Sequence, residues 1–271
     1  MDLSIIIPTY KTGEYFRETI NSIICQNLSN YKVEIIIILN GEREPYFDFI
    51  CNVTGSLPSC KVVYTQIKGV SNARNIGIKE SQGKYLLFLD DDDLLSENYI
   101  NTILDKAIEE DTIYVSNVLC FKDGTNQYYK DYIGNFMEQN NKVDQSKGRF
   151  RIMKYSKLMS SSCFKLIPKK IIDNTRFNTK LSISEDALFM FAISKNIKGI
   201  QVLDNIFYYR RVRINSAMKV KKNKGIHIKN YLKFVSSLTI VYLKNIFRLN
   251  FYFYLNRLMA STKFMFNNII K

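Results

Sequence analysis

Short apolar runs alternate with helix-like stretches up to residue 118, and this alternation constrains the fold more than any other feature. Runs rich in β-branched residues predict strands at Leu3–Pro8, Val33–Leu39, Lys61–Thr65, Lys84–Leu89 and Ile113–Val118. Helical spacing predicts helices at Thr12–Gln26, Ser71–Ser81 and Ser96–Glu110, with Ser71 and Ser96 as N-caps. The order predicts an α/β fold with a parallel sheet, and such sheets bind ligands beyond the carboxyl ends of their strands.

The second half of the sequence is less regular. Residues 122–150 are polar and punctuated by glycine, so we expect loops there, with room for a hairpin. Ser184–Asn196 predicts a helix, and Ile200–Leu203 and Ile206–Arg210 predict two strands. Two more helices are expected at roughly 226–247 and 251–268, so the α/β part is followed by a C-terminal helical extension.

The composition excludes several classes of protein. Hydrophobic residues make up 46% of the 271 residues, which is enough to bury a core and excludes a chain that is disordered throughout. Five cysteines without a CxxC pair and a single histidine, His227, leave no zinc-ligand set and favour a reducing, cytosolic compartment. The N-terminus lacks the basic region and the long apolar run of a signal peptide, which favours the same compartment.

The net charge of +14 is concentrated at the C-terminal end. Residues 205–271 contain 14 Lys and Arg residues and no Asp or Glu, whereas residues 1–204 are neutral overall. Ten Tyr and Phe residues also lie after residue 230. An anionic partner is therefore expected for this end, and both nucleic acid and a membrane surface have that charge.

A membrane surface suits the C-terminal residues better than nucleic acid does. The longest uncharged run after residue 230 is ten residues, whereas spanning a bilayer takes about 20. Basic, aromatic, amphipathic helices suit the interface of an anionic membrane, and no recognition motif points to nucleic acid, so no nucleic-acid partner is expected. The alternative is that these helices pack on the rest of the chain or on a second subunit.

Four consecutive carboxylates, Asp90–Asp93, follow the strand predicted at Lys84–Leu89. Acids that precede a helix stabilise its N-terminus, so a capping role is one interpretation. A divalent cation site is the sharper one, because Mg²⁺ and Mn²⁺ bind carboxylate oxygens together with substrate phosphates. A diphosphate would be a natural further ligand, which points to a nucleotide-linked substrate.

Several motifs together resemble glycosyltransferase family 2. They are Ser4-Ile5-Ile6-Ile7-Pro8-Thr9-Tyr10, Gly69-Val70-Ser71-Asn72-Ala73-Arg74-Asn75-Ile76-Gly77, Gly83-Lys84-Tyr85 and Phe88-Leu89-Asp90-Asp91-Asp92-Asp93. Their order and spacing are similar to those of the family over about residues 3–110. The resemblance implies a GT-A fold, which is a Rossmann-like, mostly parallel sheet with flanking helices. It also implies a nucleotide-sugar donor and a divalent cation, Mn²⁺ or Mg²⁺, held by a DxD motif.

The resemblance assigns the residues of the donor site. The DxD motif falls on Asp90-Asp91-Asp92, where Asp92 is the candidate metal ligand and Asp90 lies toward the donor ribose and the metal. The other donor-binding candidates are Pro8, Thr9, Tyr10, Arg74, Asn75 and Asp91. Arg74 could contact a phosphate, a base carbonyl or the acidic cluster itself, and the alternative is a solvated surface charge.

One position departs from the family pattern. The second strand of these enzymes usually ends in an acidic pair, where an Asp meets the uracil ring, but Leu39 and Asn40 stand here. Asn40 can still offer a hydrogen-bond donor and an acceptor to a base edge, which makes it a donor-binding candidate. The alternative is that Asn40 and Gly41 form only a tight turn, and the departure leaves the preference for uridine open.

A second pair of acids opens the helix predicted at Ser184–Asn196. Glu185 and Asp186 could simply stabilise the N-terminus of that helix. Family 2 enzymes carry a Glu-Asp pair here whose second member is the catalytic base, and Asp186 matches it. An acceptor hydroxyl must lose its proton as it attacks the anomeric carbon, and an ionised carboxylate can accept it. Glu185 would then orient the site or bind the acceptor.

Three arginines lie close together at the end of the catalytic part. The segment Tyr208–Ser216 resembles the family's Tyr-Arg…Ser segment and contains Arg210, Arg211 and Arg213. They could form a surface stripe, or a flexible loop that closes on a diphosphate leaving group, and in the second case Arg211 and Arg213 bind the donor. Arg213 stands where many relatives have His, so a metal contact by that residue is lost and its charge would neutralise phosphate directly.

These interpretations combine into one hypothesis. The chain is expected to be a metal-dependent, inverting glycosyltransferase of surface polysaccharide synthesis. It would move a sugar from a UDP-hexose or UDP-N-acetylhexosamine to a glycan or a polyprenyl-diphosphate-linked oligosaccharide. Residues 1–218 would form the catalytic domain, with a nucleotide-sugar half (1–110) and an acceptor half (111–218). Residues 219–271 would form a tail that holds the enzyme on the cytoplasmic face of the cell membrane.

Two other functions remain as alternatives. A nucleotidyltransferase could use a similar sheet, but no GxxxxGK[ST] phosphate loop occurs in the sequence. A non-catalytic membrane-binding module would explain the tail but not the acidic cluster or Asp186.

Overall fold

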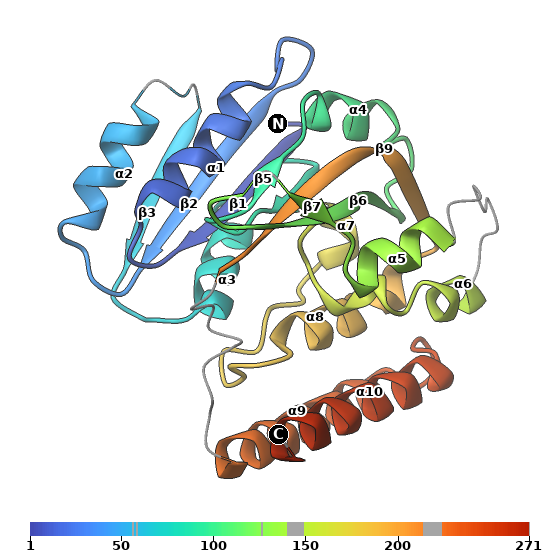
Figure 1. Cartoon of the computed structure of the whole chain (residues 1–271). Helices are drawn as coiled ribbons and strands as arrows, with labels where there is room; N and C mark the ends of the chain where they lie inside the picture. Colours follow the sequence, from blue (N-terminus) through green and yellow to red (C-terminus); the bar gives the residue numbers. More distant parts are fainter. Residues whose placement is uncertain (56, 58, 126, 140–148, 214–223, 271) are drawn as a thin grey trace.

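The computed structural model describes the whole chain except residues 56, 58, 126, 140–148, 214–223 and 271 (Figure 1). Within the described residues, nine strands form one sheet in the order β3-β2-β1-β4-β8-β6-β9-β5, and β7 pairs with β6. The strands are β1 (Leu3–Thr9), β2 (Val33–Asn40), β3 (Cys60–Thr65), β4 (Tyr85–Phe88), β5 (Leu94–Leu95), β6 (Thr112–Lys122), β7 (Tyr128–Tyr129), β8 (Lys165–Pro168) and β9 (Gly199–Val212).

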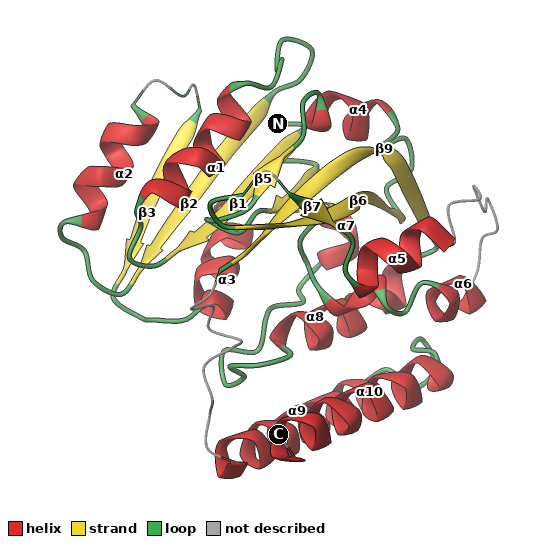
Figure 2. Cartoon of the chain, in the orientation of Figure 1, coloured by secondary structure: helices red, strands yellow, loops and turns green. Residues whose placement is uncertain are grey.

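Helices surround this sheet on both faces (Figure 2). They are α1 (Glu14–Ile24), α2 (Tyr46–Thr54), α3 (Val70–Glu80), α4 (Tyr99–Asp105), α5 (Tyr132–Gln139), α6 (Arg149–Lys154), α7 (Lys169–Ile172), α8 (Glu185–Ile193), α9 (Lys224–Lys244) and α10 (Phe251–Ile270). Two short 3₁₀ helices lie at Leu158–Ser160 and Ser194–Asn196. The α/β architecture with flanking helices and a helical C-terminal extension is the one that the sequence predicts.

The first half of the sheet is parallel, as expected. β1 pairs in parallel with β2 and β4, and β2 pairs in parallel with β3. Every residue of β1 and β2 is buried, because both faces of these strands are covered. This double coverage explains why the strands are continuous isoleucine-rich runs rather than alternating patterns. The carboxyl ends of β1, β2 and β4 therefore meet at one edge of the sheet.

The second half of the sheet is mixed, because short antiparallel strands that the sequence does not predict join the expected parallel strands; the sheet is still mostly parallel. β8 was not predicted, and it lies between β4 and β6, antiparallel to both. The two strands predicted between residues 200 and 210 form one long strand, β9, which pairs in parallel with β6. β7 forms a short hairpin with β6, but α5 is a helix where only loops were expected.

Two predicted helix N-caps are wrong. α3 begins directly after Gly69, whose φ of 126° suits glycine, and the side chain of Ser71 is buried within the helix instead of capping it. Ser96 donates its backbone N–H to the carbonyl of Phe207 in β9, so the chain is still held along the sheet at that point. For this reason α4 begins only at Tyr99, and it also ends before the predicted Glu110, at Asp105.

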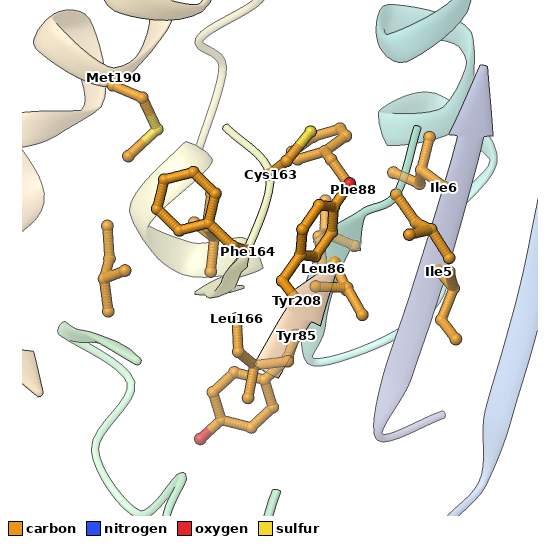
Figure 3. Close-up of a cluster of buried hydrophobic side chains, with 14 of the residues drawn as sticks. Ile5, Ile6, Tyr85, Leu86, Phe88, Cys163, Phe164, Leu166, Met190 and Tyr208 are labelled. Carbon is orange, nitrogen blue, oxygen red and sulfur yellow. The ribbon is translucent and has the colours of Figure 1, made fainter. Parts of the chain in front are cut away.

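The hydrophobic core lies directly behind the end of β4. Figure 3 shows Phe88, Phe164 and Tyr208 gathered there with other buried side chains. The ring of Phe88 meets that of Phe189 edge-on at 6.1 Å between centroids, and the rings of Phe164 and Tyr208 meet at 6.2 Å. Such pairs contribute about 0.5–1.5 kcal/mol each beyond their burial. The last residue of β4 is therefore held firmly just before the acidic segment.

The C-terminal helices α9 and α10 form a hairpin that packs against α8 (Figure 1). Phe234 of α9 and Phe253 of α10 are buried, and the Phe253 ring lies 5.4 Å from that of Phe191 in α8. Arg257 donates to the carbonyl of Ser156 at 2.6 Å. One face of the hairpin thus packs on the rest of the chain, and the opposite face is exposed. None of the described helices is long and apolar enough to cross a membrane.

Candidate active site

The acidic segment Asp90–Asp93 follows β4 at the carboxyl edge of the sheet, where a ligand site was expected. Its last carboxylate turns inward. Asp93 is 3% exposed and accepts hydrogen bonds of 2.8 Å from the Tyr208 hydroxyl and of 2.8 Å from the Arg211 N–H. Burial, with the neighbouring carboxylates, raises the pKa of Asp93 well above its usual range. Asp93 therefore attaches the segment to β9, and the other three carboxylates are left for the site.

A buried arginine joins the acidic segment to the helix that carries the expected base. Arg74 of α3 is 3% exposed. Its Nη2 donates to Asp90 Oδ1 at 2.9 Å, and its Nη1 donates to Asp186 Oδ1 at 2.5 Å. Burial opposes the charge, but the carboxylates of Asp186 and Asp90 raise the pKa of Arg74 well above its usual value. Arg74 is thus not a solvated surface charge, and it holds two distant segments of the chain in one site.

The two acids at the start of α8 have different surroundings. Asp186 accepts hydrogen bonds from the Ser162 N–H (3.1 Å) and the Ser162 hydroxyl (3.2 Å) in addition to Arg74, a set of partners that suits an ionised carboxylate. For Glu185, burial and the neighbouring charge of Asp186 raise the pKa to about 7. Its Oε1 lies 3.9 Å from Arg74 Nη1. Two carboxyl groups with different hydrogen-bond partners therefore stand side by side at the start of α8.

Asp91 and Asp92 each have one specific partner. The Thr9 hydroxyl at the end of β1 donates to Asp91 Oδ2 at 2.5 Å, and burial raises the pKa of Asp91 to about 7. Arg213 Nη2 pairs with Asp92 Oδ2 at 2.6 Å. Burial and the charge of Asp90 raise the pKa of Asp92. Thr9 and Arg213, both expected at the donor site, therefore contact the acidic segment directly.

The acidic segment fits a divalent cation only if substrate completes the ligand set. Among the described residues, no three His, Cys, Asp or Glu side chains are arranged to hold a metal ion by themselves. Asp90 and Asp92 each use one oxygen for an arginine and keep a second oxygen. Mg²⁺ is commonly bound by one or two carboxylates together with substrate phosphates and water. The two carboxylates therefore suit a hard cation that arrives with a diphosphate.

Asn40 is engaged within the chain at the end of β2. It is 4% exposed, its Nδ2 donates to the Thr9 carbonyl at 2.7 Å, and its Oδ1 accepts the Gly69 N–H at 2.9 Å. Gly41 follows with a φ of 109°, a conformation that suits glycine. A Cβ on Gly41 would lie 2.7 Å from the ring of Tyr10, which is exposed beside this glycine. Tyr10 is therefore the more accessible of the two candidates.

Two other donor candidates lie within the fold. Asn75 exchanges two hydrogen bonds with the backbone of Phe177, at 2.9 Å and 2.8 Å, so its amide ties α3 to the loop after α7. Pro8 is buried in β1, opposite Ile38 of β2. The structure therefore brings neither the Asn75 amide nor the Pro8 ring to the acidic segment, although both support the elements that carry it.

The predicted arginine loop is a strand over most of its described length. β9 continues through Arg211, because the chain there stays paired with β6. Arg211 is buried; its Nε donates to the Asp92 carbonyl at 2.9 Å, and its other nitrogens pair with Asp123 and Glu18. Arg211 therefore supports the acidic segment from behind, and Arg213 lies just beyond the strand. Residues 214–216 of the segment, like the domain boundary expected at residue 218, lie outside the described residues.

The roles of two further residues that shape this site cannot be read from the sequence. Ser162 contacts the expected base, but it lies in a serine-rich stretch without any motif. Tyr208 belongs to a segment that resembles the family, yet nothing in the sequence shows that its hydroxyl donates to Asp93. Both contacts join segments that are far apart in the sequence, so no local signal reports them.

Comparisons with known proteins identify relatives of this chain. A family model described as "Glycosyl transferase family 2" matches residues 4–176. "Minor teichoic acid biosynthesis protein GgaB" of Bacillus subtilis (strain 168) is 29% identical over 232 residues, which are 82% of this chain and 24% of that protein. "GalNAc(5)-diNAcBac-PP-undecaprenol beta-1,3-glucosyltransferase" of Campylobacter jejuni is 27% identical over 190 residues, 69% of this chain and 58% of that protein. The chain thus matches only part of the length of both relatives.

A solved structure has the same fold. The crystal structure of S. aureus TarS 1-349 in complex with UDP-GlcNAc superimposes with a TM-score of 0.72 at 17% sequence identity. The match covers 97% of this chain and 72% of that chain. This likeness confirms the expected GT-A fold, including the C-terminal helices within the matched length.

Proposed function

The chain belongs to glycosyltransferase family 2, and on this premise we propose that it is a metal-dependent, inverting enzyme that uses a UDP-linked sugar. The acceptor is a hydroxyl group of a glycan or of a lipid-linked oligosaccharide. Family membership makes the chain a glycosyltransferase, which leaves the nucleotidyltransferase and the non-catalytic module without support. We propose the identity of the donor, of the cation and of the acceptor, and the inversion at the anomeric carbon.

One observation carries the proposal. Buried Arg74 contacts Asp90 of the acidic segment and Asp186 at the start of α8 with the same guanidinium group. A sugar transferase needs its donor site and its base on opposite sides of one reacting carbon. The Arg74 bridge supports this arrangement, because it keeps the carboxylate expected at the donor within the span of one arginine from the carboxylate expected at the acceptor.

The chemistry assigned to the chain is a single displacement. The acceptor oxygen attacks the anomeric carbon while the bond from that carbon to the UDP oxygen breaks, so the configuration inverts. The proton of the hydroxyl passes to Asp186, which Ser162 and Arg74 hold in place. Glu185 is the second candidate for the base, since its pKa of about 7 suits proton transfer at neutral pH.

Asp90 and Asp92 would hold the divalent cation together with the donor diphosphate, and Arg213 would add a positive charge beside the phosphates. When bound, the cation would stabilise the negative charge that develops on the leaving UDP. Thr9 keeps Asp91 in place, and Tyr10 is the exposed ring nearest to the end of β1. These residues are the donor site of the proposal.

The named relatives suggest which substrates to test. TarS was crystallised with UDP-GlcNAc, one relative is named for minor teichoic acid biosynthesis, and another for a PP-undecaprenol acceptor. We therefore propose a role in surface polysaccharide synthesis, with UDP-hexoses and UDP-N-acetylhexosamines as donors. The experiment is a panel of UDP-, GDP- and TDP-sugars, in which nucleotide release is measured with Mn²⁺ and with EDTA. Release from a UDP-sugar only with Mn²⁺ is expected; equal release in EDTA would exclude the metal role.

We further propose that the outer face of the α9–α10 hairpin docks the enzyme on the cytoplasmic face of an anionic membrane. The apolar side chains of this face that are more than half exposed include Leu232, Ile240, Leu243, Phe247, Tyr252 and Met259. Exposed lysines accompany them, the hairpin contains no acid, and its described lysines and arginines form no ion pair. Each lysine near an anionic surface contributes about 1 kcal/mol. Residues 1–218 would then be the catalytic domain and residues 219–271 the docking extension.

A further inference from the structure

A completely buried lysine lies behind the expected base. Lys165, the first residue of β8, is 0% exposed. Within the described part of the chain, no carboxylate pairs with it. Burying an amine without a carboxylate costs free energy unless other groups satisfy its hydrogen bonds. The contacts of Lys165 therefore need a specific explanation.

Two backbone carbonyls and a ring surround the amine. Lys165 Nζ donates to the carbonyl of Ser161 at 2.8 Å and to that of Cys163 at 3.2 Å, and it lies 3.4 Å from the centre of the Phe164 ring. Burial lowers the pKa of Lys165 well below its usual value. Both the neutral amine and the ammonium have enough N–H donors for two carbonyls. The contacts therefore do not depend on the charge of Lys165.

The two carbonyls belong to the residues on either side of Ser162, which is the residue that contacts Asp186. Phe164, next in the chain, has a φ of 53°, a left-handed conformation that non-glycine residues rarely adopt. Such a conformation costs about 1–3 kcal/mol and persists only where surrounding contacts hold it. The bonds from Lys165 cross this turn and hold it, with the Phe164 ring fixed in the core (Figure 3).

We propose that Lys165 is a positioning residue for the transfer reaction. It holds the Ser161–Cys163 turn so that the Ser162 N–H and hydroxyl meet the Asp186 carboxylate. The proposal rests on the assignment of Asp186 as the base. Lys165 would then affect turnover through the Ser161–Cys163 turn and not through contact with the substrate.

The test compares Lys165→Met with Lys169→Met. Lys169, at the start of α7, also donates to a backbone carbonyl, that of Ser81, but it has no link to Asp186. We expect Lys165→Met to lower kcat for UDP release from UDP-GlcNAc about tenfold while KM for the donor changes less than about twofold, because the base and not the donor site is displaced. The acid limb of the pH–rate profile should move to higher pH, since the carboxylate loses hydrogen bonds that favour its charged form. Lys169→Met should leave kcat, KM for the donor and the pH–rate profile unchanged.

A double-mutant cycle separates positioning from general destabilisation. If Lys165 acts through the turn, Lys165→Met should lower kcat less in the Ser162→Ala background than in the unaltered enzyme, because Ser162→Ala has already removed the hydroxyl contact and keeps only the N–H contact with Asp186. Fully additive effects, or a lower melting temperature with unchanged kcat and pH profile, would overturn the proposal. If Lys165→Met does not fold, Lys165→Leu, which also removes the N–H donors but has a shorter side chain, takes its place in the same cycle.

Asp186→Asn is measured alongside these variants. An inactive Asp186→Asn enzyme together with a normal Lys165→Met enzyme would refute the role of Lys165 alone. An active Asp186→Asn enzyme would instead refute the assignment of the base.

Discussion

Among the described residues, charged side chains are paired at the carboxyl edge of the sheet but unpaired on the outer face of the α9–α10 hairpin. At the edge, Arg74 and Arg213 each meet a carboxylate, and the pair between Arg74 and Asp186 is largely buried. On the hairpin, lysines such as Lys233 and Lys244 are exposed among apolar side chains, and neither forms an ion pair with an acid in the described part of the chain. The paired charges organise a site inside the protein, whereas the unpaired charges can be satisfied only by something outside it.

The difference leads to different responses to salt and to mutation. Buried pairs are screened weakly by salt, and losing one partner leaves an uncompensated charge, so single substitutions at the edge should have large effects. Exposed charges are screened within about 10 Å at 0.1 M salt, and each contributes little alone. Substitutions in the two regions test this contrast, beginning with the largest effect.

Replacing Asp92 should have the largest effect. We expect Asp92→Ala to reduce sugar transfer below detection and to weaken UDP binding in Mn²⁺ but not in EDTA, because a carboxylate ligand is lost. Titration calorimetry with UDP and an assay of UDP release measure the two quantities. Asp48→Ala, which changes an exposed residue of α2, is the control and should match the unaltered enzyme. Full activity of the unaltered enzyme in EDTA would contradict the metal role.

Replacing Arg74 should affect both stability and turnover. Arg74→Met leaves Asp90 and Asp186 without their shared partner, and removing one member of a buried ion pair costs about 3–5 kcal/mol. Turnover should fall about a hundredfold, because the two sides of the site lose their link. Urea unfolding and UDP release are the measurements. Arg17→Met, which breaks an exposed pair with Glu14, should change the free energy of unfolding by less than about 1 kcal/mol.

Reversing charge on the hairpin should change membrane binding but not catalysis. The double variant Lys233→Glu/Lys244→Glu should bind vesicles with anionic lipid at least about tenfold more weakly in a flotation assay, and its UDP release in solution should be unchanged. The control, Lys79→Glu/Lys106→Glu, changes two exposed lysines of the catalytic part and should still float. Binding of the unaltered protein should also fall as salt rises. A protein that stays out of the anionic-vesicle fraction at low salt would contradict the docking proposal.

The smallest effect concerns stability and pH. The pKa of Asp91 is raised to about 7 by burial, and that of Glu185 is also about 7, so the folded protein keeps protons that the unfolded chain has lost between about pH 4 and 7. The free energy of unfolding should therefore fall as pH rises through this range in the absence of donor and metal. Asp91→Asn should flatten this slope and raise stability at pH 7.5 by about 1 kcal/mol. Urea unfolding at several pH values measures this slope. If the free energy of unfolding falls with pH as steeply in Asp91→Asn as in the unaltered protein, burial of the Asp91 carboxyl does not cause the pH dependence.

The sequence predicts the parallel half of the sheet well because burial on both faces leaves a strong local signal. β1 and β2 are isoleucine-rich runs, and both form where expected. β8 is different: it has four residues, begins with Lys165 and ends with Pro168, so its sequence lacks the signature of a buried central strand. Its position between β4 and β6 is set by tertiary pairing. Tertiary pairing also sets the start of α4, which begins at Tyr99 because Ser96 is still hydrogen-bonded to β9.

The candidate site is predictable where a motif carries it and not where pairing between distant segments does. The acidic segment and the Glu185-Asp186 pair are visible in the sequence, and Arg74 brings them together in the fold. Ser162 and Lys165 have no motif, because their roles depend on a contact with the distant Asp186 and on the conformation of the chain just before β8. Arg211 was expected at the donor phosphates, but β9 extends further than predicted and encloses it.

The measurement that tests the assignment of the base most directly compares UDP binding and turnover in Asp186→Asn. This substitution keeps the shape of the side chain and removes the proton acceptor. We expect that affinity for UDP stays within about twofold, while UDP release from the donor in the presence of acceptor falls about a hundredfold or more, the scale of a positioned base. Glu185→Gln, measured in parallel, should fall less. Near-normal turnover of Asp186→Asn, with Glu185→Gln inactive, would move the base to Glu185 and contradict the central assignment.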